Sequence, residues 1–200
     1  MVTTEIKVNI GCGLSGIPGW DNIDNSPTIP LSRIPYLRHL LKLPKWPADV
    51  RRCDVRRGLP YPSNSVRYIY SSHTLGEFHW QESLSVAKEC FRVLAPGGVL
   101  RVVVPDLQLI LKGYAQDPDP LASHRFLDRV SLRHTFSDRV HSGASPSQRF
   151  DARSLTHLLC TAGFASPEVS EFGKSAIPEV HLLDLEVRRS ESLYVEAKKE

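Results

Sequence analysis

The residues with the clearest chemical meaning lie near the start of the chain, where a strand that includes the apolar residues Val8 and Ile10 runs into Gly11, Cys12 and Gly13. Glycines at the end of a strand let the backbone turn tightly and approach a ligand where a side chain would collide. The acid Asp24 follows a short distance downstream. A carboxylate that closes the next strand can accept hydrogen bonds from ribose hydroxyls, so this combination indicates a site for a nucleoside cofactor.

The spacing around these glycines argues against a dinucleotide. Gly11, Gly13 and Gly16 form the pattern G-x-G-x-x-G, which in dinucleotide-binding proteins opens a helix. The sequence 17–19 that follows is Ile-Pro-Gly, through which a helix cannot run. Asp24 also arrives too early for a full crossover helix between parallel strands. An NAD(P)-dependent oxidoreductase therefore stays an alternative of lower rank.

Further motifs follow in order along the first half of the chain. They are Val8–Gly13 with Gly19–Asp24, Cys53–Pro62, Ser65–Leu75, and Phe91–Leu100 with its continuation to Asp106. In their order and spacing they resemble the class I S-adenosylmethionine-dependent methyltransferases, in particular a small branch with a shortened first crossover. The resemblance implies S-adenosylmethionine as cofactor and S-adenosylhomocysteine as product.

The resemblance also implies roles for individual residues. The backbone of Gly11, Cys12 and Gly13 would approach the cofactor, and Asp24 would bind the ribose hydroxyls. The remaining members of the implied cofactor site are Asp54 and Val55, beside the adenine, and Ser71 and Ser72, at the methionine end. Two of these residues have plainer interpretations, since Asp24 can be a cap or turn residue and Asp54 can pair with a neighbouring arginine.

Catalysis is less determined by the sequence than cofactor binding. Methyl transfer depends on alignment and needs a base only when the nucleophile must lose a proton. His73 is the predicted catalytic residue, because it follows the strand that begins at Val66 and because imidazole titrates near neutral pH; Asp106 and His141 are lesser candidates. Many relatives have Glu-His after the position of Leu75, where this chain has Gly76-Glu77. A non-catalytic nucleoside-binding or partner-binding protein is therefore the alternative from another class.

The distribution of basic residues bears on the kind of acceptor that the protein binds. Basic residues gather in two tracts: Arg33, Arg38, Lys42, Lys45, Arg51, Arg52, Arg56 and Arg57, and then Arg125, Arg129, Arg133, Arg139, Arg149 and Arg153. Such tracts form either a solvated basic face or a grip for an anionic substrate. We expect a small or medium-sized acceptor that is methylated on oxygen or nitrogen. An anionic acceptor is one of the options. Nucleic acid is less favoured, because no recognisable RNA or DNA module accompanies the charge.

Hydrophobic periodicity predicts the strands and helices that hold these residues in place. Stretch 99–104 is an apolar, β-branched run interrupted by Arg101, as in a buried parallel strand. Stretch 66–70 reads as another strand, entered through the turn at 62–65. Helical spacing precedes Pro96, and Asp151 and Gly163 bracket a second helix. Stretches 165–172 and 192–197 read as strands. These elements predict an α/β, Rossmann-like, doubly wound and mostly parallel sheet with an antiparallel terminal pair.

The 200 residues suit one domain. Within it, the proline-rich segment 26–49 is predicted to be a lid with one short helix, and segment 107–150 a substrate-side insertion. No apolar run reaches the length of a membrane span and the N-terminus lacks a signal peptide, so the sequence predicts a cytoplasmic protein without a membrane partner. Cys12, Cys53, Cys90 and Cys160 show no pairing pattern, and no metal site is expected. The oligomeric state is not predicted.

Overall fold

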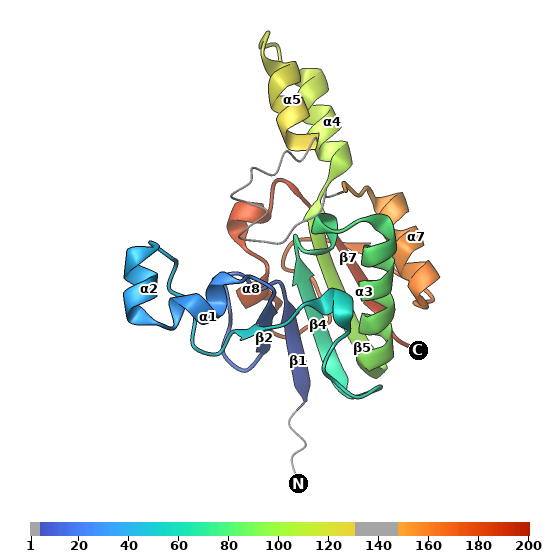
Figure 1. The fold of residues 1–200 in the computed structure, drawn as a ribbon. Helices are drawn as coiled ribbons and strands as arrows, with labels where there is room; N and C mark the ends of the chain where they lie inside the picture. The colour runs from blue at the N-terminus through green and yellow to red at the C-terminus, as the bar shows by residue number, and fades with distance from the viewer. Residues whose placement is uncertain (1–4, 131–147) are drawn as a thin grey trace.

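The computed structural model describes residues 5–130 and 148–200. Their core is a seven-stranded sheet with the order β3-β2-β1-β4-β5-β7-β6 (Figure 1). The strands are β1 (Ile6–Ile10), β2 (Asp21–Asp24), β3 (Arg51–Arg52), β4 (Val66–Ser72), β5 (Leu94–Pro105), β6 (Glu168–Ser170) and β7 (Ser192–Lys198). Strands β1 to β5 pair in parallel, whereas β7 runs antiparallel to both β5 and β6. The predicted fold class is confirmed.

Helices lie in most of the connections between these strands. The α-helices are α1 (Thr28–Ser32), α2 (Pro35–Leu40), α3 (Trp80–Val93), α4 (Leu107–Gln116), α5 (Ala122–Val130), α7 (Ala152–Ala162) and α8 (Val180–Leu183). Three short 3₁₀ turns are η1 (Val55–Arg57), η2 (Leu75–Glu77) and η3 (Glu186–Arg188). Helix α7 has the predicted caps, because Asp151 accepts a hydrogen bond from the Ser154 amide and Gly163 adopts the left-handed conformation.

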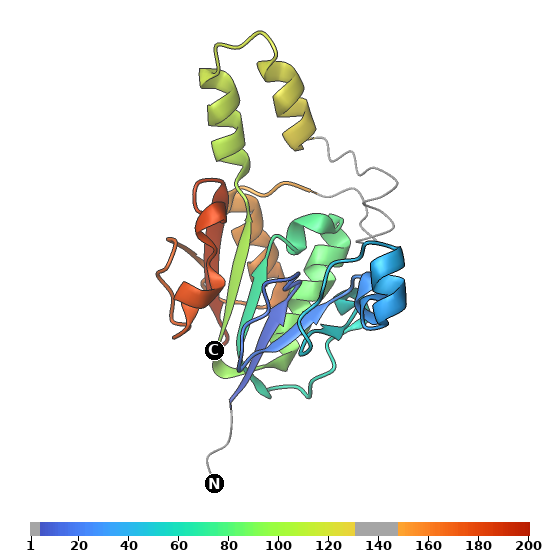
Figure 2. The ribbon, with the colours of Figure 1, turned by 90° about the vertical axis from the view of Figure 1, so that its left-hand side faces the viewer.

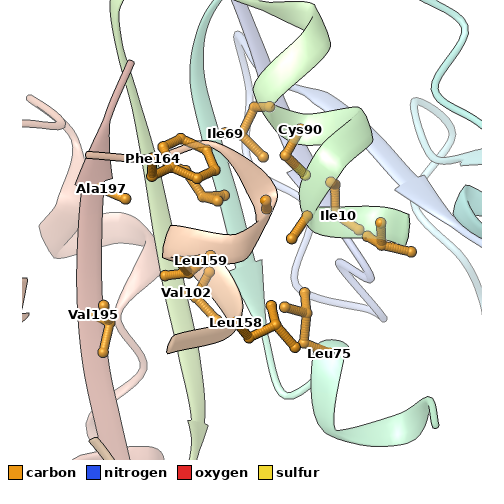
Figure 3. Packing of buried hydrophobic residues seen from close by; sticks show 14 of the residues in the cluster. Ile10, Ile69, Leu75, Cys90, Val102, Leu158, Leu159, Phe164, Val195 and Ala197 are labelled. Carbon is orange, nitrogen blue, oxygen red and sulfur yellow. The ribbon is translucent and has the colours of Figure 1, made fainter. Parts of the chain in front are cut away.

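Helices α3 and α7 cover one face of the sheet (Figures 1 and 3). The apolar side of α3 recurs at helical spacing, with Val86, Cys90 and Val93 buried against the strands. Leu155, Leu158 and Leu159 of α7 join the same core. This layer fixes the strands whose carboxyl ends carry the predicted site.

The other face is covered by shorter pieces. Ile17 and Trp20 from the β1–β2 connection and Ile177 and Leu183 from the segment around α8 pack on tyrosines and valines of the strands. Arg101 of β5 is fully buried in this layer, where its guanidinium pairs with the carboxylate of Asp184 at 2.6 Å. Sequence reasoning expected helices on both faces, but the longer helices lie on one face only.

The connection from β1 to β2 contains no helix, as the Pro-Gly pair predicted. In place of a helix, the fully buried side-chain amide of Asn22 holds this connection together. The Asn22 Oδ1 atom accepts hydrogen bonds from the Ile17 amide and from the Asn9 Nδ2 atom, both at 3.1 Å. The Asn22 Nδ2 atom donates to the Ile17 carbonyl at 2.9 Å. One side chain therefore closes a crossover that usually needs a helix.

Two strands differ in length from the prediction. Strand β5 begins at Leu94, before the Pro-Gly-Gly sequence, because a register shift in its pairing with β4 absorbs the extra residues between Leu94 and Val99. Strand β6 is shorter than the predicted stretch 165–172, since it lies at the sheet edge with β7 as its partner and follows Pro167, which has no N–H to donate.

Two excursions leave the carboxyl ends of the strands. The first, after β2, carries α1 and α2 where one short helix was expected. The second, after β5, carries α4 and α5, which project from the body as a helical pair (Figures 1 and 2). The rings of Tyr114 and Phe126 stack between these two helices with centroids 4.6 Å apart. Among the described helices, none combines the length and apolar character that a membrane span requires.

Candidate functional site

A cavity of about 470 Å³ opens where β1, β2 and β4 end. We call it the main cavity. Residues from these strand ends, from η1 and η2 and from the excursion after β2 line it: Ile10, Gly11, Ile23, Asp24, Asn25, Ser26, Trp46, Cys53, Asp54, Val55, Arg56, Ser72, His73, Thr74, Glu77, Phe78 and Arg188. In open α/β sheets this edge is where ligands bind. The main cavity therefore contains the predicted residues Gly11, Asp24, Asp54, Val55, Ser72 and His73.

The glycine loop at the end of β1 is held by the end of β2. The amides of Gly11 and Cys12 both donate to the Ile23 carbonyl, at 2.8 and 3.2 Å. Gly11 has a positive φ of 66°, and a Cβ atom added to it would lie 1.8 Å from the Thr74 Oγ1 atom. Gly13 also has a positive φ, of 53°, but faces open space. Glycine is therefore required at position 11 by conformation and by contact, and the loop leaves room for a ligand at position 13.

Asp24 connects this loop to the next segment. Its carboxylate accepts hydrogen bonds from the Gly13 amide at 3.1 Å and from the Ser26 amide at 2.8 Å. Asp24 is therefore a turn residue, which was one of the two interpretations of the sequence. Because a carboxylate offers about four acceptor sites, two backbone amides leave capacity for further donors from the cavity.

Asp54 is engaged by its neighbour Arg56. The Nε and Nη2 atoms of Arg56 lie 2.9 and 3.0 Å from the two carboxylate oxygens, and the Arg56 amide donates to Oδ1 at 3.2 Å. These hydrogen bonds lower the pKa of Asp54 below its usual value, so the group is ionised at neutral pH. The sequence left open an ion pair with an arginine, and this pair is present beside the cavity.

The wall next to Asp54 is apolar. Val55 is buried, and Cys53 and Phe78 are partly buried, all three lining the main cavity. Trp46 also lines the main cavity and is held by a hydrogen bond from its Nε1 atom to the Thr28 Oγ1 atom, at 2.9 Å. Such a mixture of an apolar wall with a few fixed acceptors suits a heteroaromatic ring that carries hydrogen-bond donors.

Two further cavities adjoin the main one. The loop cavity, of about 340 Å³, is lined by Gly11, Cys12, Gly13, Ser72 and others on the glycine loop. The side cavity, of about 260 Å³, is lined by Gly76, Glu77, Pro105, Ile110, Arg149 and Glu191 beside the two residues named next. His73 and Arg188 line all three cavities. This pair therefore marks the point where the cavities meet.

His73 has a partner on each ring nitrogen. Its Nδ1 atom lies 3.0 Å from the Arg188 Nη1 atom, and its Nε2 atom lies 2.9 Å from the Ser192 Oγ atom. Since a guanidinium can only donate, Nδ1 is the acceptor and Nε2 carries the proton. Burial, with the positive charge of Arg188, lowers the pKa of His73 to about 4. At neutral pH the ring is therefore uncharged.

The other predicted residues are distributed unevenly. Cys12 and Gly13 line the loop cavity, whereas Ser71 is fully buried and lines none of the three cavities. Burial raises the pKa of the Cys12 thiol to about 12, so it stays neutral. Asp106 caps α4, its carboxylate accepting from the Gln108 amide at 2.8 Å. The predicted residues Arg133, Arg139 and His141 lie outside the described residues.

Sequence reasoning missed several lining residues. Arg188 belongs to η3, far along the chain from the motifs, and no local pattern marks it. Arg149, which was noted only as part of a basic tract, lines the side cavity, where burial lowers its pKa. Thr74 and Phe78 stand beside motif residues, and the closeness of Thr74 to Gly11 is visible only in three dimensions.

Within residues 5–130 and 148–200, no group of His, Cys, Asp and Glu side chains is arranged to hold a metal ion. The four cysteines are free thiols. Asp24, Asp54 and His73 are each engaged by backbone or arginine donors. The polar groups described at the site are backbone amides, carboxylates, guanidinium groups and the His73 imidazole.

Comparison with known proteins shows which proteins the chain is similar to. A family model described as "Methyltransferase domain" matches residues 27–102. The matched residues include several of the motifs of the first half of the chain, and the match agrees with the resemblance to the class I S-adenosylmethionine-dependent methyltransferases. S-Adenosylmethionine is the cofactor of this family.

Individual relatives agree with this class. A probable S-adenosylmethionine-dependent methyltransferase of Mycolicibacterium smegmatis is 32% identical over 119 residues, which are 56% of this chain and 35% of that protein. The chain thus spans about one third of the curated relative that it matches.

Solved structures share the fold. An S-adenosylmethionine-dependent methyltransferase from Mesorhizobium loti has a TM-score of 0.55 at 22% identity, with 97% of this chain and 90% of that chain covered. The structure of PigF with SAH has a TM-score of 0.55 at 16% identity, with 98% of this chain and 56% of that chain covered. At these identities the likeness concerns the fold alone.

Proposed function

We propose that this chain binds S-adenosylmethionine across the main and loop cavities and transfers its methyl group to an acceptor in the side cavity. The observation that carries the proposal is the meeting of all three cavities at His73 and Arg188. A transferase needs two ligands whose reacting atoms face each other at one point. The family match and the strand-end location support the same assignment.

The residues of the main cavity fit the cofactor. The carboxylate of Asp24 has acceptor capacity beyond its two backbone donors and suits the ribose hydroxyls. Val55 and Phe78 offer an apolar wall for the adenine, with Asp54 at its edge as an acceptor for the exocyclic amine. The open space before Gly13 suits the methionine end. Ser72 lines both cavities and lies between these parts.

When bound, S-adenosylmethionine supplies an electrophilic methyl group on a sulfonium sulfur. An acceptor oxygen or nitrogen would form a bond to the methyl carbon, the carbon–sulfur bond would break, and S-adenosylhomocysteine would leave as a neutral thioether. The chain's own residues orient the acceptor. Arg149 and Arg188 line the side cavity together with Glu77 and Glu191, and the Arg188 Nη1 atom donates to the Glu191 Oε1 atom at 3.1 Å. Guanidinium groups bind carboxylate or phosphate oxygens by paired hydrogen bonds. A small acceptor with an anionic group therefore fits this cavity.

His73 is proposed as a positioning residue for Arg188 rather than as the base. An imidazole with a pKa of about 4 is a weak proton acceptor at neutral pH, and its Nδ1 lone pair is used by Arg188. The proton of an acceptor hydroxyl or amine would leave to solvent or to a carboxylate such as Glu77. The predicted role of His73 as general base is the competing proposal.

Calorimetry tests the cofactor assignment. S-Adenosylmethionine and S-adenosylhomocysteine should both bind and raise the unfolding temperature, whereas NAD⁺ and NADP⁺ should do neither. Absence of heat with both adenosyl compounds on folded protein would overturn the proposal. A screen with methyl-labelled cofactor then separates the transferase from a binding protein, because a non-catalytic chain binds cofactor without labelling any acceptor. Carboxylated and phosphorylated acceptors should be labelled more readily than neutral analogues.

A further inference from the structure

The excursion after β2, residues 26–48, forms an arm, and only the residues at the base of this arm line the main cavity. We call it the α1–α2 arm. Its base is fixed: Ile29 is buried with Cys12 and Val50, and the Arg33 Nη2 atom donates to the Val50 carbonyl at 2.7 Å. Ser26 and Trp46 of the same segment line the main cavity. The arm is therefore held firmly to the body beside the cavity.

The tip of the arm is apolar and uncovered. Helix α2 contains no buried residue and stands away from the sheet (Figures 1 and 2). Tyr36 is 73% exposed, Leu40 60%, Leu41 52% and Ile34 49%. Scattered exposed apolar residues are normal, but several gathered on one short segment mark a contact surface.

The same segment is strongly basic. It contains Arg33, Arg38, Lys42 and Lys45, and not one Asp or Glu occurs between positions 26 and 48. Among the described residues, the side chains of Arg38, Lys42 and Lys45 form no ion pair, in contrast with Arg51 and Arg56 further on, which pair with Asp21 and Asp54. The charge on the arm is therefore not neutralised within this part of the chain.

We propose that the α1–α2 arm docks on the surface of a lipid bilayer that contains anionic lipids. Exposed aliphatic and tyrosine side chains enter the boundary between headgroups and acyl chains, while arginine and lysine stay with the phosphates. The sequence predicted no membrane partner because no span is present, but surface docking requires no span. Docking would hold the main cavity beside the lipid surface, because Ser26 and Trp46 belong to the same arm.

Other occupants suit the arm less well. A second copy of the chain would bring two uncompensated basic tips together in a symmetric contact, where like charges repel. A nucleic acid would supply negative charge, but single strands are bound with bases stacked on aromatic rings, and Tyr36 is the exposed aromatic residue of a tip that is otherwise aliphatic. Binding to nucleic-acid phosphates requires no exposed aliphatic side chains. Charge and aliphatic character together favour an anionic bilayer.

Vesicle flotation tests the proposal on the full chain. The chain should float with vesicles of equal parts phosphatidylcholine and phosphatidylglycerol but not with phosphatidylcholine alone, and high salt should reduce binding. The double variant Tyr36→Ser, Leu40→Ser should lose flotation. Each of Arg38→Ala and Lys42→Ala should weaken binding about 5-fold, the factor expected for one cation near an anionic surface.

Matched variants outside the arm serve as controls. Val169→Ser removes an apolar side chain that is 58% exposed, and Lys88→Ala removes an exposed cation; both should float like the unmodified chain. Thermal unfolding confirms that every variant is folded. Failure of the unmodified chain to float, or equal flotation by the arm variants, would overturn the proposal. It would also be overturned by arm-dependent dimerisation or polynucleotide binding without flotation. These readouts need no methyl transfer, so they are independent of the proposed function.

Discussion

The Arg188 Nη1 atom lies 3.0 Å from the His73 Nδ1 atom, and this contact joins two parts of the chain that are 115 residues apart. Because the two residues line all three cavities, their geometry sets the boundary between the proposed cofactor site and the proposed acceptor site. His73 has a positive φ of 56°, which is uncommon for a residue with a side chain. Its backbone is held by a hydrogen bond from the His73 amide to the Val103 carbonyl at 2.7 Å.

The buried histidine should make stability depend on pH. Its pKa is about 4 in the folded chain and about 6.5 when unfolded, so only the unfolded chain is protonated between these values. The free energy of unfolding should therefore decrease by about 1.4 kcal/mol per pH unit on acidification from pH 6.5 towards 4. Urea unfolding at several pH values measures this slope. The His73→Gln variant should lack it, whereas His124→Gln, at an exposed position, should keep it.

The carboxylate of Asp24 should be essential for cofactor binding. Asp24→Ala should weaken S-adenosylhomocysteine at least tenfold, because loss of a charged hydrogen-bond acceptor costs about 1.5–3 kcal/mol. Titration calorimetry gives the dissociation constant. Asp106→Ala is the matched control, since Asp106 caps α4 and lines none of the three cavities. Unchanged affinity of the Asp24 variant would place the nucleoside site elsewhere.

The glycine loop should not tolerate a side chain at position 11. Gly11→Ala places Cβ 1.8 Å from the Thr74 Oγ1 atom and strains a positive φ. We expect lower thermal stability and loss of cofactor binding. Gly173→Ala separates the two causes, because Gly173 has a φ of 71° but nothing within 4 Å of the added Cβ. This control should show the conformational cost alone, about 1 kcal/mol. Equal effects of both variants would remove the steric argument.

The buried ion pair behind the sheet should be costly to break. Arg101 and Asp184 are both fully buried at their side chains, and Asp184 also accepts from the Gly173 amide at 2.8 Å. Arg101→Met leaves that carboxylate without its partner and should cost about 3–5 kcal/mol of unfolding free energy. Arg189→Met, in an exposed pair with Glu186, should cost about 0–1 kcal/mol. Chemical denaturation measures both.

Substitutions that affect Arg149 or Arg188 should weaken binding of the acceptor without weakening binding of the cofactor. Once a labelled acceptor is known, Arg149→Ala should raise its Michaelis constant while cofactor affinity stays unchanged, because Arg149 lines the side cavity and not the main cavity. If His73 positions Arg188, His73→Gln should raise the same constant; if His73 is the base, it should lower turnover by roughly 10²–10⁴-fold. Steady-state kinetics distinguishes these outcomes.

Local sequence patterns predicted the parts of the site that local backbone determines. The strand-glycine sequence ending at Gly13, the caps Asp151 and Gly163, and the lack of a helix before Asp24 all follow from φ preferences and hydrogen-bond donors of nearby residues. Arg188 could not be predicted, because its place depends on how the segment behind the sheet returns to β7. The burial of Ser71 likewise depends on the packing of neighbouring strands, which alternation alone does not determine.

The excursion that carries α4 and α5 leaves and rejoins the body at neighbouring points. Asp106 and Phe150 form a parallel bridge, and the Leu107 amide donates to the Phe150 carbonyl at 2.9 Å. A segment whose two ends are already held together can change length at small entropic cost, since loop closure depends only weakly on length. The segment beside the proposed acceptor cavity can therefore be exchanged in evolution or by grafting, while the strand ends that position Gly11, Asp24 and Asp54 stay in place.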